Sequence, residues 1–277
     1  MDKYELETHV LNRYVLGLEM GYKMLWQDIG SPDQGREYIG LSGAGRCRRQ
    51  QAFPVSPAEA TPLTVAQRAI FKDGFLFEAD TLTRLEVGGV WIINVGRTVR
   101  HPDLEIIQGH IDAEITHPPT GKAYIVEIKS MRGYPQQKTL GGKKHNHVAR
   151  EHVGGWVLKA GTTRAVQPEY WAQVQCYMWA SRAEEGVGDG CIMIYRMKED
   201  GRIAVEYIEY DAERAREMLA RVECVAGSHA EAMLPSCEYD PNSEKDWQCL
   251  YCAYRETCAV LPAGRVPYAD LASRKEA

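Results

Sequence analysis

Apolar residues recur at helical spacing in four parts of the chain, and five other stretches have the shorter period and the composition of strands. The first pattern predicts amphipathic helices and the second predicts β-strands. The predicted helices cover residues 3–29, 64–85, 168–185 and 212–233. The predicted strands cover residues 90–95, 104–116, 123–130, 191–197 and 203–210. This succession predicts an α/β fold with a central mixed β-sheet flanked by helices.

Turn signals between the predicted strands indicate how the strands pair. Residues 117–121 read His-Pro-Pro-Thr-Gly, so the strands on either side should form an antiparallel hairpin. Glu199–Gly201 predicts a second hairpin. Residues 133–161 are rich in Gly, Lys and His and are expected to form a long loop, which in a compact domain is usually functional or mobile. Ser42 is expected to cap a short helix that carries Cys47.

The chain is expected to form a single domain over residues 1–277. Its expected parts are an N-terminal helical region (1–63) with Cys47, a core (64–232) and a cysteine-rich C-terminal region (233–277). Hydrophobic residues make up 44% and charged residues 26%, as in ordinary globular proteins. No apolar stretch is long enough to span a bilayer and the first residues do not resemble a signal peptide, so we expect a cytoplasmic protein without a membrane partner.

Two acidic residues and a lysine lie on neighbouring predicted strands. Asp112 ends a G-x-x-D pattern, and Glu127 and Lys129 form E-x-K on the next strand. Side chains two positions apart on a strand share a face, so Glu127 and Lys129 should point to one side and Ile128 into the core. Such a set suits phosphodiester cleavage, in which carboxylates hold a divalent cation that activates water, and the lysine stabilises developing charge or helps to deprotonate that water. The same residues also fit the solvent face of an amphipathic hairpin, because E-x-K is a short and common pattern.

Four motifs taken in order resemble the RecB-like branch of the PD-(D/E)xK nuclease superfamily. They are Gly74–Glu78, Gly109–Asp112, Glu127–Lys129 and Gln173–Tyr177. The resemblance implies a restriction-endonuclease-like core around a Mg²⁺ or Mn²⁺ ion. The residues that it implies as metal ligands are Glu78, Asp112 and Glu127. The residues that it implies for catalysis are Asp112, Glu127, Lys129, Gln173 and Tyr177.

Two positions depart from the pattern of that branch. Ile111 stands where the superfamily has its proline, a change that the branch tolerates widely. Glu78 stands where the branch usually has a metal-binding histidine; glutamate is a good ligand for Mg²⁺ or Mn²⁺, although Glu78 also fits a solvated helix residue. Gln173 and Tyr177 lie four residues apart and share a helix face. The resemblance implies that this pair positions the DNA backbone or the lysine, whereas the residues alone also fit an apolar core.

Eight cysteines are present, and half of them lie near the C-terminus. Cys249, Cys252 and Cys258 form C-x₂-C-x₅-C, a spacing that can wrap a metal ion or cluster if a fourth thiol is supplied. The candidates for the fourth thiol are Cys47 and Cys237. The spacing does not separate an iron–sulfur cluster, a zinc site and buried free thiols. The other cysteines, expected in the core, are Cys176, Cys191 and Cys224.

The cysteine tail resembles the iron–sulfur subgroup of RecB-like nucleases, which includes AddB-type and CRISPR-adaptation nucleases. In that subgroup the first cysteine lies far upstream of the other three. The resemblance therefore implies a structural [4Fe-4S] cluster, with Zn²⁺ as the alternative, that joins the N- and C-terminal regions. Its implied ligands are Cys47, Cys249, Cys252 and Cys258.

The formal net charge of −5 does not by itself indicate a nucleic-acid partner, but a local basic groove can still bind phosphate in an acidic protein. The residues expected to contact DNA are Arg46, Arg48, Arg49, Lys143, Lys144 and Arg150. No helix-turn-helix or zinc-finger pattern is evident, so we expect recognition of the DNA backbone with little base specificity.

These features predict a metal-dependent DNA nuclease. By analogy with the family we expect an exonuclease that acts on single strands or DNA ends, in recombination, repair, or phage or CRISPR DNA processing, with a recombination or CRISPR-adaptation protein as a partner. One alternative is a non-catalytic DNA-binding accessory protein on the same fold. Another is a restriction-type endonuclease, for which the sequence offers no specificity element.

Overall fold

The computed structural model describes residues 37–272 apart from 62–63, 118–120 and 186–189. Its strands are β1 (Ile39–Gly40), β2 (Trp91–Val95), β3 (Thr98–Arg100), β4 (Ile107–His110), β5 (Ala113–His117), β6 (Lys122–Met131), β7 (Val148–His152), β8 (Gly155–Leu158), β9 (Gly190–Met197), β10 (Ile203–Glu209), β11 (Met233–Leu234) and β12 (Val266–Pro267). Its α-helices are α2 (Arg48–Ala52), α3 (Val65–Val87), α4 (Tyr134–Leu140), α5 (Thr162–Val166), α6 (Pro168–Glu185), α7 (Ala212–Ala230), α8 (Trp247–Leu250), α9 (Arg255–Ala259) and α10 (Tyr268–Ala272). Short 3₁₀ helices are η1 (Leu41–Gly43), η2 (Phe53–Val55) and η3 (Gly142–Lys144).

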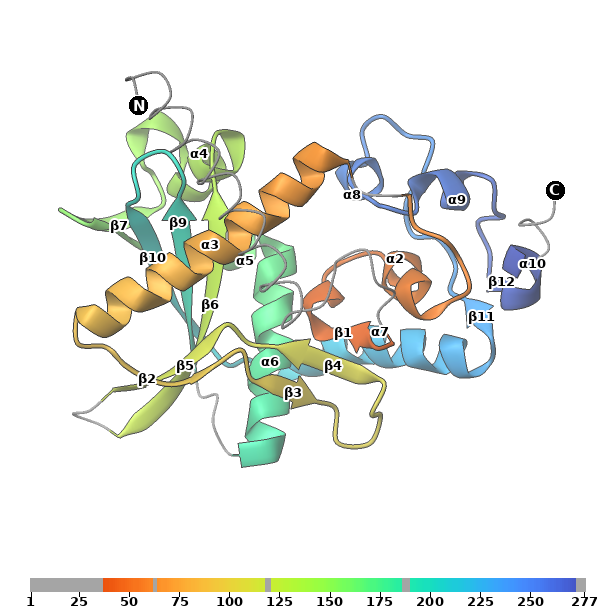
Figure 1. The fold of residues 1–277 in the computed structure, drawn as a ribbon, viewed down its shortest axis with the longest axis horizontal. Helices are drawn as coiled ribbons and strands as arrows, with labels where there is room; N and C mark the ends of the chain where they lie inside the picture. Colours follow the sequence, from red (N-terminus) through yellow and green to blue (C-terminus); the bar gives the residue numbers. More distant parts are fainter. Residues whose placement is uncertain (1–36, 62–63, 118–120, 186–189, 273–277) are drawn as a thin grey trace, which may run out of the picture. The chain divides into compact units, whose positions relative to one another are not determined.

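A mixed sheet forms the centre of the described chain (Figure 1), with the strand order β2-β5-β6-β9-β10-β8-β7. The pairs β5/β6 and β9/β10 are antiparallel, so both predicted hairpins are confirmed. β6 and β9 run parallel, which makes the sheet mixed as the sequence predicts. The helix expected from Pro168 to Glu185 is α6. The helix expected over residues 64–85 is confirmed as α3, and the first nineteen residues of the helix expected over residues 212–233 are confirmed as α7.

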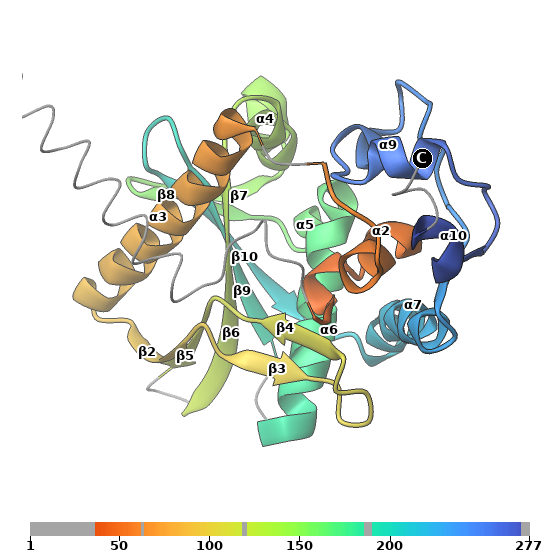
Figure 2. The ribbon, with the colours of Figure 1, turned by 45° about the vertical axis from the view of Figure 1, so that its right-hand side comes forward.

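Alternate residues of β6 face two different layers. Val126 and Ile128 pack with Leu82 of α3 in a small apolar cluster, whereas Ile125 belongs to the main core that contains much of α6. This is the two-residue period of a strand covered on both faces. In both views, α2, α7, α9 and α10 lie together to the right of α6, with the seven-stranded sheet to its left (Figures 1 and 2).

The structure corrects several predicted elements. Residues 104–116 are not one strand: the chain leaves β4, which belongs to a separate sheet ordered β1-β4-β3, and enters β5 only after Ile111 and Asp112. Residues 133–161 are not a loop but contain α4, η3, β7 and β8. Ser42 lies inside η1, and Cys47 rather than Ser42 precedes α2 at its N-cap. The helix expected over residues 3–29 lies outside the described residues.

No helix among the described residues is both long and apolar enough to cross a bilayer.

Candidate active site

Asp112 lies where the chain passes from the three-stranded sheet into the seven-stranded sheet. The β5/β6 ladder pairs Ala113 with Val126, which places Asp112 beside Glu127. The Asp112 Oδ2 atom accepts a hydrogen bond of 2.6 Å from the backbone N–H of Ile128. The break between β4 and β5 therefore turns this carboxylate toward β6 instead of continuing the alternation of a strand.

Glu127 is fully buried, and its two carboxylate oxygens have different surroundings. Oε1 accepts hydrogen bonds from Lys129 Nζ and, at 2.6 Å, from Gln173 Nε2. Oε2 is buried and has no hydrogen-bond partner among the described residues. A buried carboxylate oxygen without a donor is costly, and a bound cation would satisfy it.

Three carboxylates influence one another at this site. Burial and then the charge of Glu127 raise the pKa of Glu78 to about 7, against the opposing effect of Lys129. Burial, followed by the charges of Glu127 and Glu78, raises the pKa of Asp112 well above its usual range. The structure thus brings together the three residues that the sequence predicts as metal ligands. Such mutual repulsion is relieved by a divalent cation with oxygen ligands.

Lys129 is the positive charge of this site. Burial lowers the pKa of its ammonium group, but Glu127 and Asp112 outweigh burial and raise that pKa above its usual range. The Nζ atom also lies 5.3 Å from the centre of the Tyr170 ring. Lys129 is therefore protonated at neutral pH in the metal-free protein, which favours a role in charge stabilisation over one as a general base.

Gln173 and Tyr177 connect α6 to this carboxylate group. The Gln173 Nε2 atom also donates to the Tyr177 hydroxyl at 3.1 Å, so the predicted pair holds Glu127 from the helix side. Gly109 on β4 makes this packing possible, since an added Cβ would lie 2.5 Å from Tyr177 Cε1 and 3.1 Å from Leu41 Cβ. The glycine of the G-x-x-D motif is thus explained by close packing of β4 against α6.

The sequence profile of the PD-(D/E)XK nuclease superfamily matches residues 75–259, more than half of the chain. The chain belongs to this nuclease superfamily. The match covers every predicted active-site residue and the three C-terminal cysteines but not Cys47.

Solved structures of two exonucleases are similar to this one at low sequence identity. The alkaline exonuclease of Laribacter hongkongensis in complex with dAMP is 15% identical, with a TM-score of 0.44 over 70% of this chain and 89% of that chain. A phage-related exonuclease from Haemophilus somnus 129PT is 13% identical, with a TM-score of 0.42 over 70% of this chain and 94% of that chain. No curated protein sequence matches the chain significantly.

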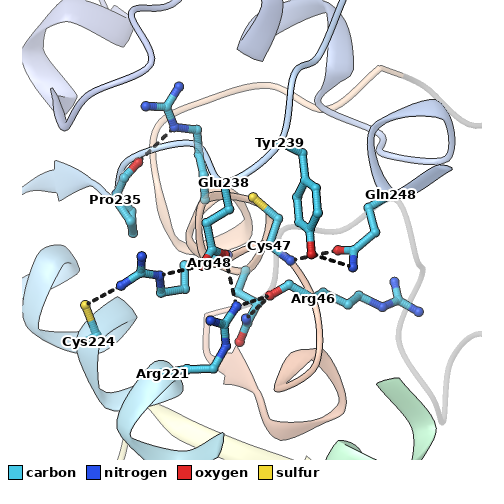
Figure 3. Close-up of polar contacts among 11 residues, drawn as sticks. Arg46, Cys47, Arg48, Arg221, Cys224, Pro235, Glu238, Tyr239 and Gln248 are labelled. Carbon is cyan, nitrogen blue, oxygen red and sulfur yellow. Dashed lines mark hydrogen bonds and ion pairs between the residues drawn. The ribbon is translucent and has the colours of Figure 1, made fainter. Parts of the chain in front are cut away.

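Of the four arginines predicted to contact DNA, the three around Cys47 lie in different environments. Arg46 is exposed. Arg48 forms an ion pair of 3.1 Å with Glu238, which also binds Arg221 (Figure 3). Arg49 is fully buried and donates to backbone carbonyls, so its predicted contact with phosphate does not fit the structure. Its burial has no signal in the sequence, where it is one of three neighbouring arginines.

Lys143, Lys144 and Arg150 are exposed on η3 and β7. They belong to a wider basic segment, residues 132–164, that contains seven Lys or Arg residues and one acidic residue. The members that sequence reasoning missed are Arg132, Lys138, Lys159 and Arg164. The segment follows directly after β6, which carries Glu127 and Lys129. A count of Lys and Arg against Asp and Glu over the whole of residues 132–164 would have identified these four residues from the sequence.

Five cysteines line one cavity between α2 and the C-terminal region. They are Cys47, Cys237, Cys249, Cys252 and Cys258. The backbone N–H of Cys47 donates to Gln248 Oε1 at 2.9 Å, and Gln248 binds the Tyr239 hydroxyl (Figure 3). The described cysteines form no disulfide. Cys176 and Cys191 are buried in the core as predicted, whereas Cys224 is exposed.

Arg49 and Arg255 also line this cysteine cavity. Within the part of the chain that the structure describes, Arg49 has backbone carbonyls and the Cys258 sulfur as partners, the latter at 3.7 Å, and no carboxylate. A buried guanidinium without an acidic partner favours negative charge on the thiols beside it. Among the described residues, no three His, Cys, Asp or Glu side chains are already arranged around one metal position, at this cavity or at the carboxylates.

Proposed function

We propose that this PD-(D/E)XK protein is a Mg²⁺- or Mn²⁺-dependent deoxyribonuclease whose active site consists of Glu78, Asp112, Glu127 and Lys129. The observation that carries the proposal is the buried Oε2 atom of Glu127, which has no hydrogen-bond partner among the described residues. Glu127 lies close to the carboxylates of Asp112 and Glu78, which cannot donate a hydrogen bond to it when they are ionised. This chemistry fits a hard divalent cation, because such ions take oxygen ligands and are scarcely competed for by nitrogen or sulfur.

The protein groups have separate roles in this proposal. Glu78, Asp112 and Glu127 would hold the ion, which when bound polarises the scissile phosphate and lowers the pKa of an attacking water. Lys129, kept protonated by the carboxylates, stabilises charge that develops on the phosphate oxygens. Gln173 fixes the Glu127 carboxylate through Oε1 and leaves Oε2 available, and Tyr177 holds the Gln173 amide.

The basic segment supports DNA as the substrate. Exposed lysines and arginines that follow the catalytic strand suit a phosphate backbone, and no base-reading motif accompanies them. We therefore propose that the substrate is single-stranded DNA or DNA ends and that cleavage is exonucleolytic. The biological context in this proposal is recombination, repair, or phage or CRISPR DNA processing, with a partner protein from that process.

The cysteine cavity supports a metal centre, a [4Fe-4S] cluster or alternatively Zn²⁺, held by Cys249, Cys252, Cys258 and Cys47. The residues fit such a group because thiols from distant segments converge beside the buried Arg49. Its role is structural. Gly45, two residues before Cys47, packs against α6 so closely that a Cβ would lie 2.6 Å from the Glu169 Cα atom. The centre would thus hold the parts of one domain together next to the helix that carries Gln173.

The nuclease proposal is tested by cleavage of end-labelled single- and double-stranded DNA with Mg²⁺ or Mn²⁺ and with chelator. D112N, E127Q and K129M should each lose at least about 100-fold in rate, since each removes a metal ligand or the charge beside it. D80N is the matched control, because Asp80 is a carboxylate on α3 that pairs with Arg84 and Arg196 instead.

The labelled end that is degraded first gives the polarity of an exonuclease. Cleavage by D112N or E127Q at the wild-type rate would contradict the proposal. DNA binding without cleavage in the wild-type protein would instead support a non-catalytic accessory protein.

A further inference from the structure

The cysteine cavity contains one thiol more than a four-ligand metal centre requires. The fifth is Cys237, which lies twelve residues before Cys249 and outside the C-x₂-C-x₅-C pattern. Its sulfur lies 3.6 Å from the sulfur of Cys258. Two thiolates on one tetrahedral ion, each about 2.3 Å from the metal, lie about 3.8 Å apart. Cys237 and Cys258 are therefore spaced like two ligands of a single ion such as Zn²⁺, whereas the thiolates of a [4Fe-4S] cluster bind different irons and lie farther apart.

Three sets of contacts hold Cys237 in this place. The strand β11, just before it, pairs with β12 through Leu234 and Val266. The backbone N–H of Cys237 donates to the Ala263 carbonyl at 2.8 Å. The buried guanidinium of Arg49 donates to the Pro235 carbonyl at 2.8 Å and to carbonyls of residues 262–264. These contacts of residues 234, 235 and 237 thus fix the position of the Cys237 thiol.

Cys237 lines the same cavity as Cys47, Cys249 and Cys252. The two candidate fourth ligands, Cys47 and Cys237, can therefore serve the same metal centre. The Cys237 S–H now donates to the Tyr239 carbonyl at 2.9 Å, a proton that ligation would release.

We propose that Cys237 is a metal-ligating residue of this cavity that can occupy the coordination position of Cys47. The inference rests on the metal centre proposed above. A site with four obligatory thiols would lose its metal when any one of them is replaced. In this protein Cys249, Cys252 and Cys258 are each required for metal binding, whereas Cys47 and Cys237 substitute for one another.

The test compares C47S, C237S, the double variant C47S/C237S and C224S, each purified as the full chain without oxygen. C224S is the matched control, since Cys224 is exposed on α7 and does not line the cavity. Iron, acid-labile sulfide and zinc are measured per chain together with the visible absorption spectrum, and circular dichroism checks that each variant is folded. We expect C47S to keep most of its metal and the double variant to hold at least about tenfold less.

A second measurement, on C47S alone, tests the inference if the double variant does not fold. In C47S, alkylation of Cys237 is followed by mass spectrometry before and after chelation. Protection that is lost when the metal is removed supports ligation, and equal modification in both states contradicts it.

The outcomes separate this inference from the proposal on which it rests. A wild-type protein without bound metal would overturn both. A C47S protein that is empty, or a double variant as full as C47S, would overturn the role of Cys237 alone. DNA cleavage enters none of these readouts, so the nuclease proposal stands or falls separately.

Discussion

At the scale of single residues, the site is defined by how each carboxylate oxygen is used. Glu127 has two donors on one oxygen and none from the described chain on the other. One carboxylate oxygen of Asp112 accepts a hydrogen bond from the backbone N–H of Ile128. Lys129 compensates only part of the negative charge, because Glu78 and Asp112 still have raised pKa values. The metal-free site is therefore electrostatically unfavourable and is poised to bind a cation.

This charge balance predicts how stability depends on pH without metal. The folded protein raises the pKa of Glu78 from 4.5 to about 7, so it favours the protonated carboxyl group. The resulting stabilisation is present below the unfolded pKa and is lost as the pH rises through the folded pKa. In chelator, the free energy of unfolding should fall from about pH 5 to about pH 8, and it should fall less in E78Q.

Chemical denaturation at several pH values measures this effect. Excess Mn²⁺ should restore stability more at the alkaline end, by about 2.7 kcal/mol at a hundred times the dissociation constant. A wild-type protein whose pH dependence equals that of E78Q would show that Glu78 is not part of this charged group.

At the scale of elements, the site depends on the junction between the two sheets. β4 pairs with β1 and β3, whereas β5 pairs with β2 and β6. The close approach of Gly109 to Tyr177 fixes β4 against α6, and Gln173 on the same helix face reaches Glu127. Asp112, three residues after Gly109, is therefore placed by helix packing as well as by the strand ladder.

The G109A variant tests this packing. Because the new methyl group would overlap the Tyr177 ring, the free energy of unfolding should decrease by about 1–3 kcal/mol and cleavage should weaken. G74A is the matched control: an added Cβ at Gly74 meets nothing within 4 Å, and alanine in the middle of α3 should raise stability by about 0.5–1 kcal/mol. Denaturant unfolding of both variants measures the difference. Equal stability of G109A and wild type would contradict the packing argument.

The elements show which parts of the fold are readable from the sequence. α6 and the two hairpins have strong local signals, namely a helix-starting proline and clear turn residues, and the structure has them as predicted. The break before Asp112 has no such signal, because residues 104–116 remain compatible with one strand although the chain changes sheets. Residues 133–161 were misread because their glycines and lysines suggest a loop, whereas Trp156 and Leu158 are buried on β8.

At the scale of the whole molecule, the sequence predicts a candidate active-site set because its motifs occur in a fixed order. Asp112 lies at the junction between β4 and β5, Glu127 and Lys129 lie on β6, and Gln173 lies on α6. The fold brings these side chains together. The same approach fails for Arg49, since a guanidinium buried against backbone carbonyls has no local pattern. The sequence offers Cys237 only as an alternative to Cys47 for the fourth thiol, because Cys237 lies outside the C-x₂-C-x₅-C pattern and its segment is positioned by long-range pairing.

Mn²⁺ binding measured by calorimetry tests most directly whether the carboxylates of Glu78, Asp112 and Glu127 form a metal site. The account predicts that wild-type protein and D80N bind the ion alike, and that E127Q, which alters the carboxylate with the unpartnered oxygen, binds it at least about tenfold more weakly. Equal Mn²⁺ affinity in E127Q and wild type, or no binding by the wild-type protein, would contradict it.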